Sequence, residues 1–200
     1  MGLRSIVRRR FRVTTQSKHA FPIAPNRLGR RFQVEGPNRV WVSDITYIRL
    51  QQGWVYLAVF IDLFSRQVVG WALSRSLDHG LVLKALERAR QKRKPEPGLM
   101  IHSDRGVQYA CTGFRQVLKR YGYVQSMSRK ADCWDNAAAE SFFHLLKSEL
   151  IYHYAWYGYA DVHAALFEYI ELFYNRERTH STLGYLTPVD FEQQALKIAA

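Results

Sequence analysis

Three carboxylates, Asp44, Asp104 and Glu140, stand in stretches that otherwise read as strands or helices, and together they could carry metal chemistry. Hard oxygen donors of this kind suit Mg²⁺ or Mn²⁺. Three protein carboxylates that leave coordination positions open can hold two such ions, which promote phosphoryl transfer. No single acid decides the matter, because each also has an ordinary structural explanation.

The first two acids are predicted to lie on or directly after strands. Asp44 shares its alternating side with Val42, Thr46 and Ile48, where a carboxylate is costly unless it is paired or binds a metal. The structural alternative is an edge strand with one face partly exposed to solvent. Asp104 follows the stretch LMIHS and begins an Asp-x-Gly sequence, which is also common turn chemistry.

Glu140 belongs to the stretch SRKADCWDNAAAESFF, which contains two further acids. Asp132 and Asp135 precede a helix predicted from about residue 136, and we interpret them as loop and capping residues. Within that helix Glu140 shares one face with Asn136 and Lys147, so it lies on a polar stripe. The alternative is a solvent-facing charge, paired with Lys147 or with nothing.

The elements that must position these acids are three strands followed by alternating helices and strands. The three strands have hairpin spacing, and the second is apolar enough to be buried on both faces. The helix after them has Asp78 as its expected N-cap. The predicted elements are strands at 40–50, 54–64 and 67–74, a helix at 78–94, a strand at 99–102, a helix at 112–121, a strand at 123–127, and helices at 136–151 and 159–175 before a Pro-containing tail. This order predicts an α/β domain in which helices flank a mixed five-stranded sheet.

The composition supports one folded domain with a real core, since the 200 residues are 48% hydrophobic and 14% aromatic. No apolar run approaches the ~18 residues of a membrane span, and the basic N-terminus lacks the apolar part of a secretory signal. A soluble, cytoplasmic protein is therefore expected. Cys111 and Cys133 form no C-x-x-C pair, so neither a zinc site nor a disulfide framework is indicated.

Basic residues are concentrated at the N-terminus. Nine of the 29 Lys and Arg lie in the first 34 residues without an acid, so the other 166 residues carry 20 basic and 17 acidic groups, or +3 of the net +12. Residues 1–37, with little periodicity, are predicted to be a basic N-terminal arm or linker. Such arms commonly meet phosphate backbones, and Arg8, Arg9 and Arg10 are the candidates; the alternative is a solvated tail.

Five stretches in order carry a resemblance to a known family: VWVSDITYI, AVFIDLFSRQVVGW, IHSDRGVQY, SMSRKADCWDNAAAESFFHLLKSEL and YNRERTHSTLGYLTPVDF. Over residues 38–192 the chain resembles the catalytic core of bacterial insertion-sequence transposases of the IS-three family, which are relatives of retroviral integrases. Between Asp104 and Glu140 lie 140 − 104 − 1 = 35 residues, the spacing known for the family's Asp-Asp-Glu triad.

The resemblance implies a ribonuclease H-like fold in which Asp44, Asp104 and Glu140 are catalytic and bind Mg²⁺ or Mn²⁺ as two ions. The implied reaction is hydrolysis at a transposon end, which exposes a 3′-hydroxyl, followed by attack of that hydroxyl on another DNA. The implied partners are double-stranded DNA, as transposon ends and as target, and further copies of the chain on that DNA. Residues 38–192 form the implied catalytic core and 193–200 a C-terminal tail, in a bacterial protein that joins the nucleoid when bound to DNA.

Other polar residues receive less central expectations. Asp62 is predicted to be a turn residue or an ion-pair partner of Arg66, and His102 to be packed or orienting. The candidates for DNA contacts near the site, the alternative being a merely basic rim, are Asn136, Lys147, Arg129, Lys130 and Arg105. The residues expected to dock the C-terminal tail onto the core are Asn175, Arg176 and His180. The tryptophans expected in the core are Trp41, Trp54 and Trp71.

Two other functions stay open on the sequence. A nuclease with the same fold would cleave DNA or an RNA–DNA hybrid without strand transfer. A truncated, non-catalytic remnant of a transposase would bind DNA ends without chemistry. Members of the family carry a helix-turn-helix region ahead of the core, so we interpret the arm as a remnant of that region and expect a helix-turn-helix partner from an adjacent reading frame. A truncated copy, a miscalled start and a catalytic subunit that needs this partner are all compatible with the sequence.

Overall fold

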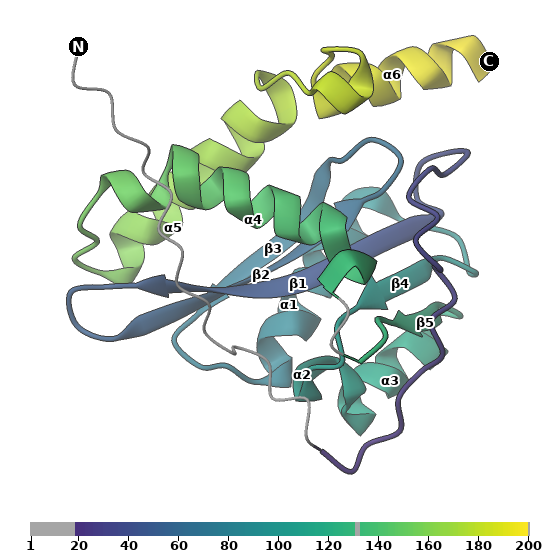
Figure 1. Ribbon diagram of the computed structural model, residues 1–200, viewed down its shortest axis with the longest axis horizontal. Coiled ribbons are helices and arrows are strands. Elements are labelled where there is room, and N and C mark those ends of the chain that lie inside the picture. Colours follow the sequence, from purple (N-terminus) through teal and green to yellow (C-terminus); the bar gives the residue numbers. More distant parts are fainter. Residues whose placement is uncertain (1–18, 131–132, 200) are drawn as a thin grey trace.

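A five-stranded sheet with the order β3-β2-β1-β4-β5 lies between two layers of helices in the computed structural model, which describes residues 19–130 and 133–199 (Figure 1). The antiparallel pairs are β1 with β2 and β2 with β3, and the parallel pairs are β1 with β4 and β4 with β5. The strands are β1 (Val40–Arg49), β2 (Trp54–Asp62), β3 (Val68–Ser74), β4 (Met100–Ser103) and β5 (Val124–Met127). The predicted mixed sheet and its five strands are confirmed.

The helices divide between the two faces of the sheet (Figure 1). One face packs on α1 and α3, and the other packs on α4, α5 and the π-helical turn that follows α5. Central strand β2 is buried on both faces, as its unbroken apolar run predicts. The helices are α1 (His79–Arg93), α2 (Val107–Ala110), α3 (Thr112–Arg120), α4 (Ala137–Glu149), α5 (Tyr159–Phe167), the π-helix Glu168–Tyr174 and α6 (Pro188–Ala199). No helix in the described part of the chain is long and apolar enough to cross a membrane.

Two parts of the helical prediction need correction. The short helix α2, directly after Asp104, was not predicted, because four residues leave no periodic pattern to detect. The C-terminal tail contains α6, which begins at Pro188, the first helical position that proline favours. Asp78 caps α1 as expected, since its carboxylate accepts a hydrogen bond from Leu81 N at 3.1 Å.

Residues 19–37, which we call the N-terminal strap, lie along β5 and lead into β1 (Figure 1). Leu28 is only 3% exposed and belongs to the core. The backbone N–H groups of Arg27 and Leu28 donate to Ser126 Oγ at 2.9 and 3.2 Å. This half of the predicted arm is therefore packed onto the domain, although its basic composition suggested a free polycation. Arg8, Arg9 and Arg10 lie outside the described residues.

The C-terminal segment docks onto β3 through the Asn175 side chain, whose amide makes the pair of hydrogen bonds that a neighbouring strand would make. Asn175 Oδ1 accepts from Val68 N at 2.9 Å, and Asn175 Nδ2 donates to Val68 O at 3.0 Å. His180 is buried and packs edge-on against Tyr174, with ring centroids 4.9 Å apart. The docking role predicted for Asn175 and His180 is confirmed, whereas Arg176 is exposed.

Asp62 is a buried turn residue, but its ion-pair partner is not the predicted one. Its carboxylate accepts from Asn38 N at 2.7 Å and from the Trp41 indole at 3.3 Å, and it lies 3.5 Å from Arg93 Nη2. Arg66 instead donates its backbone N–H to Asp62 O at 2.8 Å. The prediction of an Arg66 ion pair is therefore wrong, because α1 brings Arg93 over the turn.

Two of the three tryptophans predicted to be in the core are there. Trp41 and Trp71 are buried, whereas Trp54 is 41% exposed. Trp54 is the first residue of β2 and packs edge-on against Tyr47, with ring centroids 6.4 Å apart. The prediction for Trp54 is wrong because the turn at the end of the hairpin lies beyond the covering helices.

Candidate active site

The register of two parallel strands sets two of the acids side by side. The last paired residues of β1 and β4 are Ser43 and Ser103. Asp44 and Asp104 occupy the next position on each strand, where pairing ends and β1 continues beyond β4. Neighbouring strands are ~4.8 Å apart, so the two carboxylates meet at the carboxyl end of β4.

A small pocket opens at this point, and one of its lining residues, Tyr109, belongs to a buried hydrogen-bonded unit. Both acids line the pocket together with Gln108 and Tyr109 of α2. Ser43 Oγ donates to Val59 O at 2.8 Å, so the buried Tyr109 hydroxyl donates to Ser43 Oγ, also at 2.8 Å. This unit ties α2 to β1 beneath the acids.

Helix α4 brings the third acid over the same point. Its buried side chains, Ala139, Phe142, Phe143 and Leu146, belong to the core cluster that contains the β1 residues Val42 and Ile48. Glu140 is exposed on this helix, and Lys147, two turns further along, is half-buried. The side chains of Glu140 and Lys147 both act electrostatically on Asp44, so the face predicted from the sequence turns toward the pocket.

The surroundings of Asp44 and Glu140 disfavour the charged forms of these two carboxyl groups. Burial first, and then the negative charge of Asp104, raise the pKa of Asp44 well above its usual range. Glu140 adds to this rise, and Lys147 opposes it. Burial also raises the pKa of Glu140 and lowers the pKa of Lys147. An added cation would relieve the repulsion, and carboxylate oxygens are the donors that Mg²⁺ and Mn²⁺ prefer.

The acids are not yet gathered into a finished metal site. Within residues 19–130 and 133–199, no three His, Cys, Asp or Glu side chains lie close enough to hold a metal ion as they stand. Asp44 and Asp104 form a neighbouring pair, whereas Glu140 is exposed on α4 and acts on Asp44 through its charge. The three residue types suit a divalent ion, but in the described structure Glu140 is not gathered with the Asp44–Asp104 pair.

Asp135 differs from its predicted capping role, and its neighbour Asn136 is buried beside it. Helix α4 begins at Ala137 after a short turn, and no side chain among the described residues caps it. Asn136 is buried and donates through Nδ2 to Ser43 O at 3.3 Å, so it joins the start of α4 to β1 beside Asp44. Asp135 is completely buried in an ion pair with Arg129 and caps nothing. Asp132 lies outside the described residues.

The remaining candidates form the rim of the site or its support. Arg129 is half-exposed and binds Asp135 at 2.9 Å, Arg105 donates through Nε to Ser128 O at 2.6 Å, and Lys130 is exposed. His102 is completely buried, and burial lowers its pKa to about 4, so its ring is neutral. The predicted packed role of His102 is confirmed.

Sequence reasoning missed the residues that line and support the pocket beside the two acids. Tyr109, Gln108 and Ser43 received no role, although Gln108 and Tyr109 follow Asp104 in the stretch IHSDRGVQY. The signal available was a tyrosine five residues after an acid, close enough to turn back on it through one helical turn.

Comparison with known proteins places this site in a family. Models described as integrase core domain match residues 34–133 and 140–196. A 31 kDa protein of insertion element IS600 from Shigella sonnei is 42% identical over 200 residues, which cover all of this chain and 74% of that protein. The transposase InsF of insertion sequence IS3A from Escherichia coli (strain K12) is 43% identical over 195 residues, covering 98% of this chain and 68% of that one. The chain belongs to the IS3 family of transposases. The predicted membership and the predicted transposase function are confirmed.

The transposase shares its fold with retroviral integrases. A chain of the simian T-cell lymphotropic virus intasome in complex with PP2A regulatory subunit B56 gamma has a TM-score of 0.67 at 16% identity, covering 89% of the transposase and 60% of that chain. The HTLV-2 integrase catalytic core domain in complex with magnesium, in its trimeric form, has a TM-score of 0.57 at 16% identity, covering 80% and 99%. At such identity the similarity concerns the fold, and the predicted ribonuclease H-like fold is confirmed.

Proposed function

We propose that this transposase cleaves transposon ends and joins the exposed 3′-hydroxyl to target DNA, with Asp44, Asp104 and Glu140 holding two divalent ions, Mg²⁺ or Mn²⁺. The observation that carries the proposal is the β1–β4 register, which makes Asp44 and Asp104 neighbours under the helix that bears Glu140. The HTLV-2 integrase core, which has the same fold and was solved in complex with magnesium, supports the choice of metal.

Asp44, Asp104 and Glu140 would hold the ions, which would supply activation of the attacking oxygen and stabilisation of the leaving oxygen of the phosphodiester. The protein holds the carboxylates in position. Asp44 is fixed by its strand and by a hydrogen bond from Ile45 N to its own Oδ1 at 2.8 Å. Asp104 Oδ1 accepts from Gly106 N at 2.9 Å, which holds that carboxylate at the end of β4.

Glu140 supplies the movable ligand. Because the Asp44–Asp104 pair carries like charges, a third carboxylate is repelled from it until cations are present. The exposed position of Glu140 is consistent with this order of events. Lys147 places a positive charge near Asp44 throughout and limits the repulsion.

The same proposal includes DNA contacts around the pocket. Lys130, Arg105 and the outer side of Arg129 are basic and adjoin the loop that leads into α4. The residues proposed to contact DNA are Asn136, Lys147, Arg129, Lys130, Arg105, Arg8, Arg9 and Arg10. Two copies on paired transposon ends, and a helix-turn-helix partner from an adjacent frame, are the proposed assembly.

The test uses the purified chain with Mn²⁺ or Mg²⁺ and labelled duplexes that carry the element's terminal inverted repeats. We expect a nick that leaves a 3′-hydroxyl, followed by products joined to target DNA. Glu140→Gln and Asp104→Asn are expected to abolish both reactions without loss of DNA binding. Glu96→Gln, which alters an exposed acid after α1, is the matched control.

Each other outcome assigns a different function. Cleavage without joined product would identify a nuclease of the same fold. Binding of the repeats without either reaction would identify a non-catalytic remnant. Full activity of Glu140→Gln would remove that residue from the proposed metal site.

A further inference from the structure

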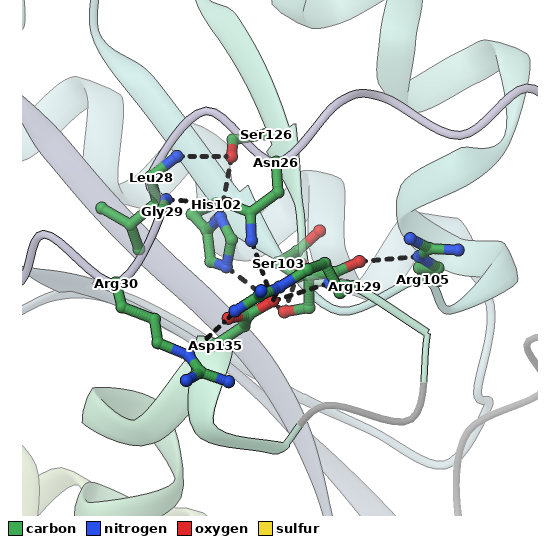
Figure 2. Close-up of polar contacts among 11 residues, drawn as sticks. Asn26, Leu28, Gly29, Arg30, His102, Ser103, Arg105, Ser126, Arg129 and Asp135 are labelled. Atoms are coloured by element: carbon green, nitrogen blue, oxygen red, sulfur yellow. Dashed lines mark hydrogen bonds and ion pairs between the residues drawn. The ribbon is translucent and has the colours of Figure 1, made fainter.

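The buried carboxylate of Asp135 is held from three directions just before helix α4 (Figure 2). Oδ2 accepts from Asn26 Nδ2 at 2.8 Å and from Arg129 N at 2.8 Å and Nε at 3.1 Å. Oδ1 accepts from Arg30 Nε at 3.0 Å and from Arg129 Nη2 at 2.9 Å. The hydrogen bonds from Arg129, followed by the one from Arg30, hold the pKa of Asp135 far below its usual range.

These contacts join three segments that are distant in the sequence. Asn26 and Arg30 come from the N-terminal strap, Arg129 from the loop after β5, and Asp135 from the turn that starts α4. Glu140 lies five residues after Asp135 on that helix. Because a buried carboxylate is costly to leave with fewer donors, this Asp135 clamp fixes where α4 begins.

The strap is also bonded to the strands that present Asp104. Two strap N–H groups, those of Arg27 and Leu28, donate to Ser126 Oγ, which leaves the Ser126 hydroxyl proton for His102 Nδ1 at 2.8 Å. His102 lies on β4, two residues before Asp104. One segment therefore holds both the strand that ends at one acid and the helix that carries another.

Of the four clamp residues, Asn26, Arg30 and Asp135 lie outside the two integrase-core matches, and Arg129 lies inside the first. Strap residues 19–33 precede the match over residues 34–133, and Asp135 falls between that match and the one over residues 140–196. The consequence of the clamp concerns Glu140, which is not yet gathered with the other acids in the described chain. A helix start that shifts by ~1 Å would displace a catalytic group enough to cost on the order of 100-fold in rate.

We propose that Asn26 and Arg30 of the strap are positioning residues: through Asp135 they set the start of α4 and thereby the reach of Glu140 toward Asp44 and Asp104. This inference rests on the proposed function, since it assigns a purpose to the placement of Glu140. The competing explanation is that Arg30, which is half-exposed, contacts a DNA phosphate.

Two variants separate these explanations. Asn26→Asp keeps the oxygen that accepts from Gly29 N at 2.9 Å but turns a second carboxylate toward Asp135. Arg30→Gln removes one charged donor from the clamp. Arg31→Gln is the matched control, because Arg31 is exposed on the same strap and donates to Arg27 O.

The measurements are kcat and KM for cleavage of the repeat duplex, and hydrogen exchange of the full chain. We expect both clamp variants to lower kcat on the order of 10- to 100-fold and to change KM by less than about twofold. Amides in the first turns of α4 are expected to exchange faster, while those of β2 keep wild-type rates and report an intact fold. Arg31→Gln is expected to leave kcat and the exchange of α4 unchanged.

The inference is overturned if Arg30→Gln raises KM alone and leaves α4 exchange unaltered, which would make Arg30 a DNA contact. It is also overturned if both variants keep wild-type kcat. Should Asn26→Asp expose β2 to exchange, the milder Arg30→Gln decides by the same two readouts. A wild-type chain that neither nicks nor joins DNA would sink the proposed function, whereas hydrogen exchange of the variants would still test the clamp.

Discussion

Replacing Asp104 with asparagine is expected to stabilise the metal-free transposase, because it removes one of two like charges that the β1–β4 register sets side by side. Asparagine has the same shape, and its Oδ1 can still accept from Gly106 N. The substitution therefore changes charge at the site while keeping the size of the side chain and this hydrogen bond. An acid proposed to be essential for activity is thus expected to reduce stability.

The size of the effect follows from the strand spacing. Two unit charges ~5 Å apart repel by ~3 kcal/mol at an effective dielectric constant of ~20. Both carboxylates are half-buried and open to water on one side, so we expect about 2 kcal/mol after screening. For a chain of this length, that gain corresponds to a rise in Tm of roughly 4 to 8 °C.

The stability gained by Asp104→Asn is expected to increase with pH. The pKa of Asp44 is raised in the folded protein, so the unfolded chain releases this proton first as pH increases. The wild-type protein therefore loses stability from the ordinary carboxyl range up to the raised pKa, and the loss is complete above it. The difference between Asp104→Asn and wild type is expected to grow with pH over that window.

Thermal unfolding in chelator at about pH 5 and about pH 8 measures this difference. Asp161→Asn is the control, since Asp161 also accepts from a nearby backbone N–H, that of Gly158 at 3.1 Å. Mg²⁺ is expected to raise the Tm of wild type more than that of Asp104→Asn. A lower Tm for Asp104→Asn at the higher pH, or an equal gain at both values, would refute the argument from adjacent charges.

Three further substitutions test other parts of the structure. Gly70→Ala would place a Cβ 2.5 to 2.6 Å from atoms of α1, so we expect a loss of about 1 to 3 kcal/mol in urea unfolding, and an unchanged midpoint would contradict the packing of β3 on that helix. Asn175→Ala removes both hydrogen bonds to Val68; about 1 to 3 kcal/mol of stability is expected to be lost, with faster exchange of the Val68 amide, whereas a protected amide would disprove the docking role. Lys147→Met removes a positive charge that lowers the pKa of Asp44, so calorimetric binding of Mn²⁺ is expected to require a higher pH than in wild type, and identical pH profiles would exclude that influence.

Local patterns were sufficient to predict the five strands and the capped helix α1, because hydrophobic periodicity and turn residues act over short distances. They also raised Asp44 and Asp104 as candidates, although each had an ordinary structural explanation. Their adjacency is a matter of register between β1 and β4, which no local pattern contains. The resemblance to a family supplied that link.

The predictions for Asp135 and for the N-terminal arm failed because of contacts between segments that are distant in the sequence. Asp135 precedes a helix and has the right chemistry for a cap, but its partners Asn26 and Arg30 lie 109 and 105 positions away. The strap has the composition of an arm, yet Leu28 packs into the core and two N–H groups bond to β5. Long-range satisfaction of buried polar groups overrides local propensity at such positions.

The two hydrogen bonds between the Asn175 amide and the backbone of Val68 limit how copies of the protein can pair through β3. A strand at the border of a sheet is a template for pairing with another chain. Along β3, Asn175 occupies both backbone groups of Val68, and the Tyr159 hydroxyl donates to Leu73 O at 2.9 Å. On the opposite border, the strap lies along β5 (Figure 1). Both borders are thus guarded against strand addition and the aggregation that follows from it, so the proposed assembly on DNA would have to form through helices and loops.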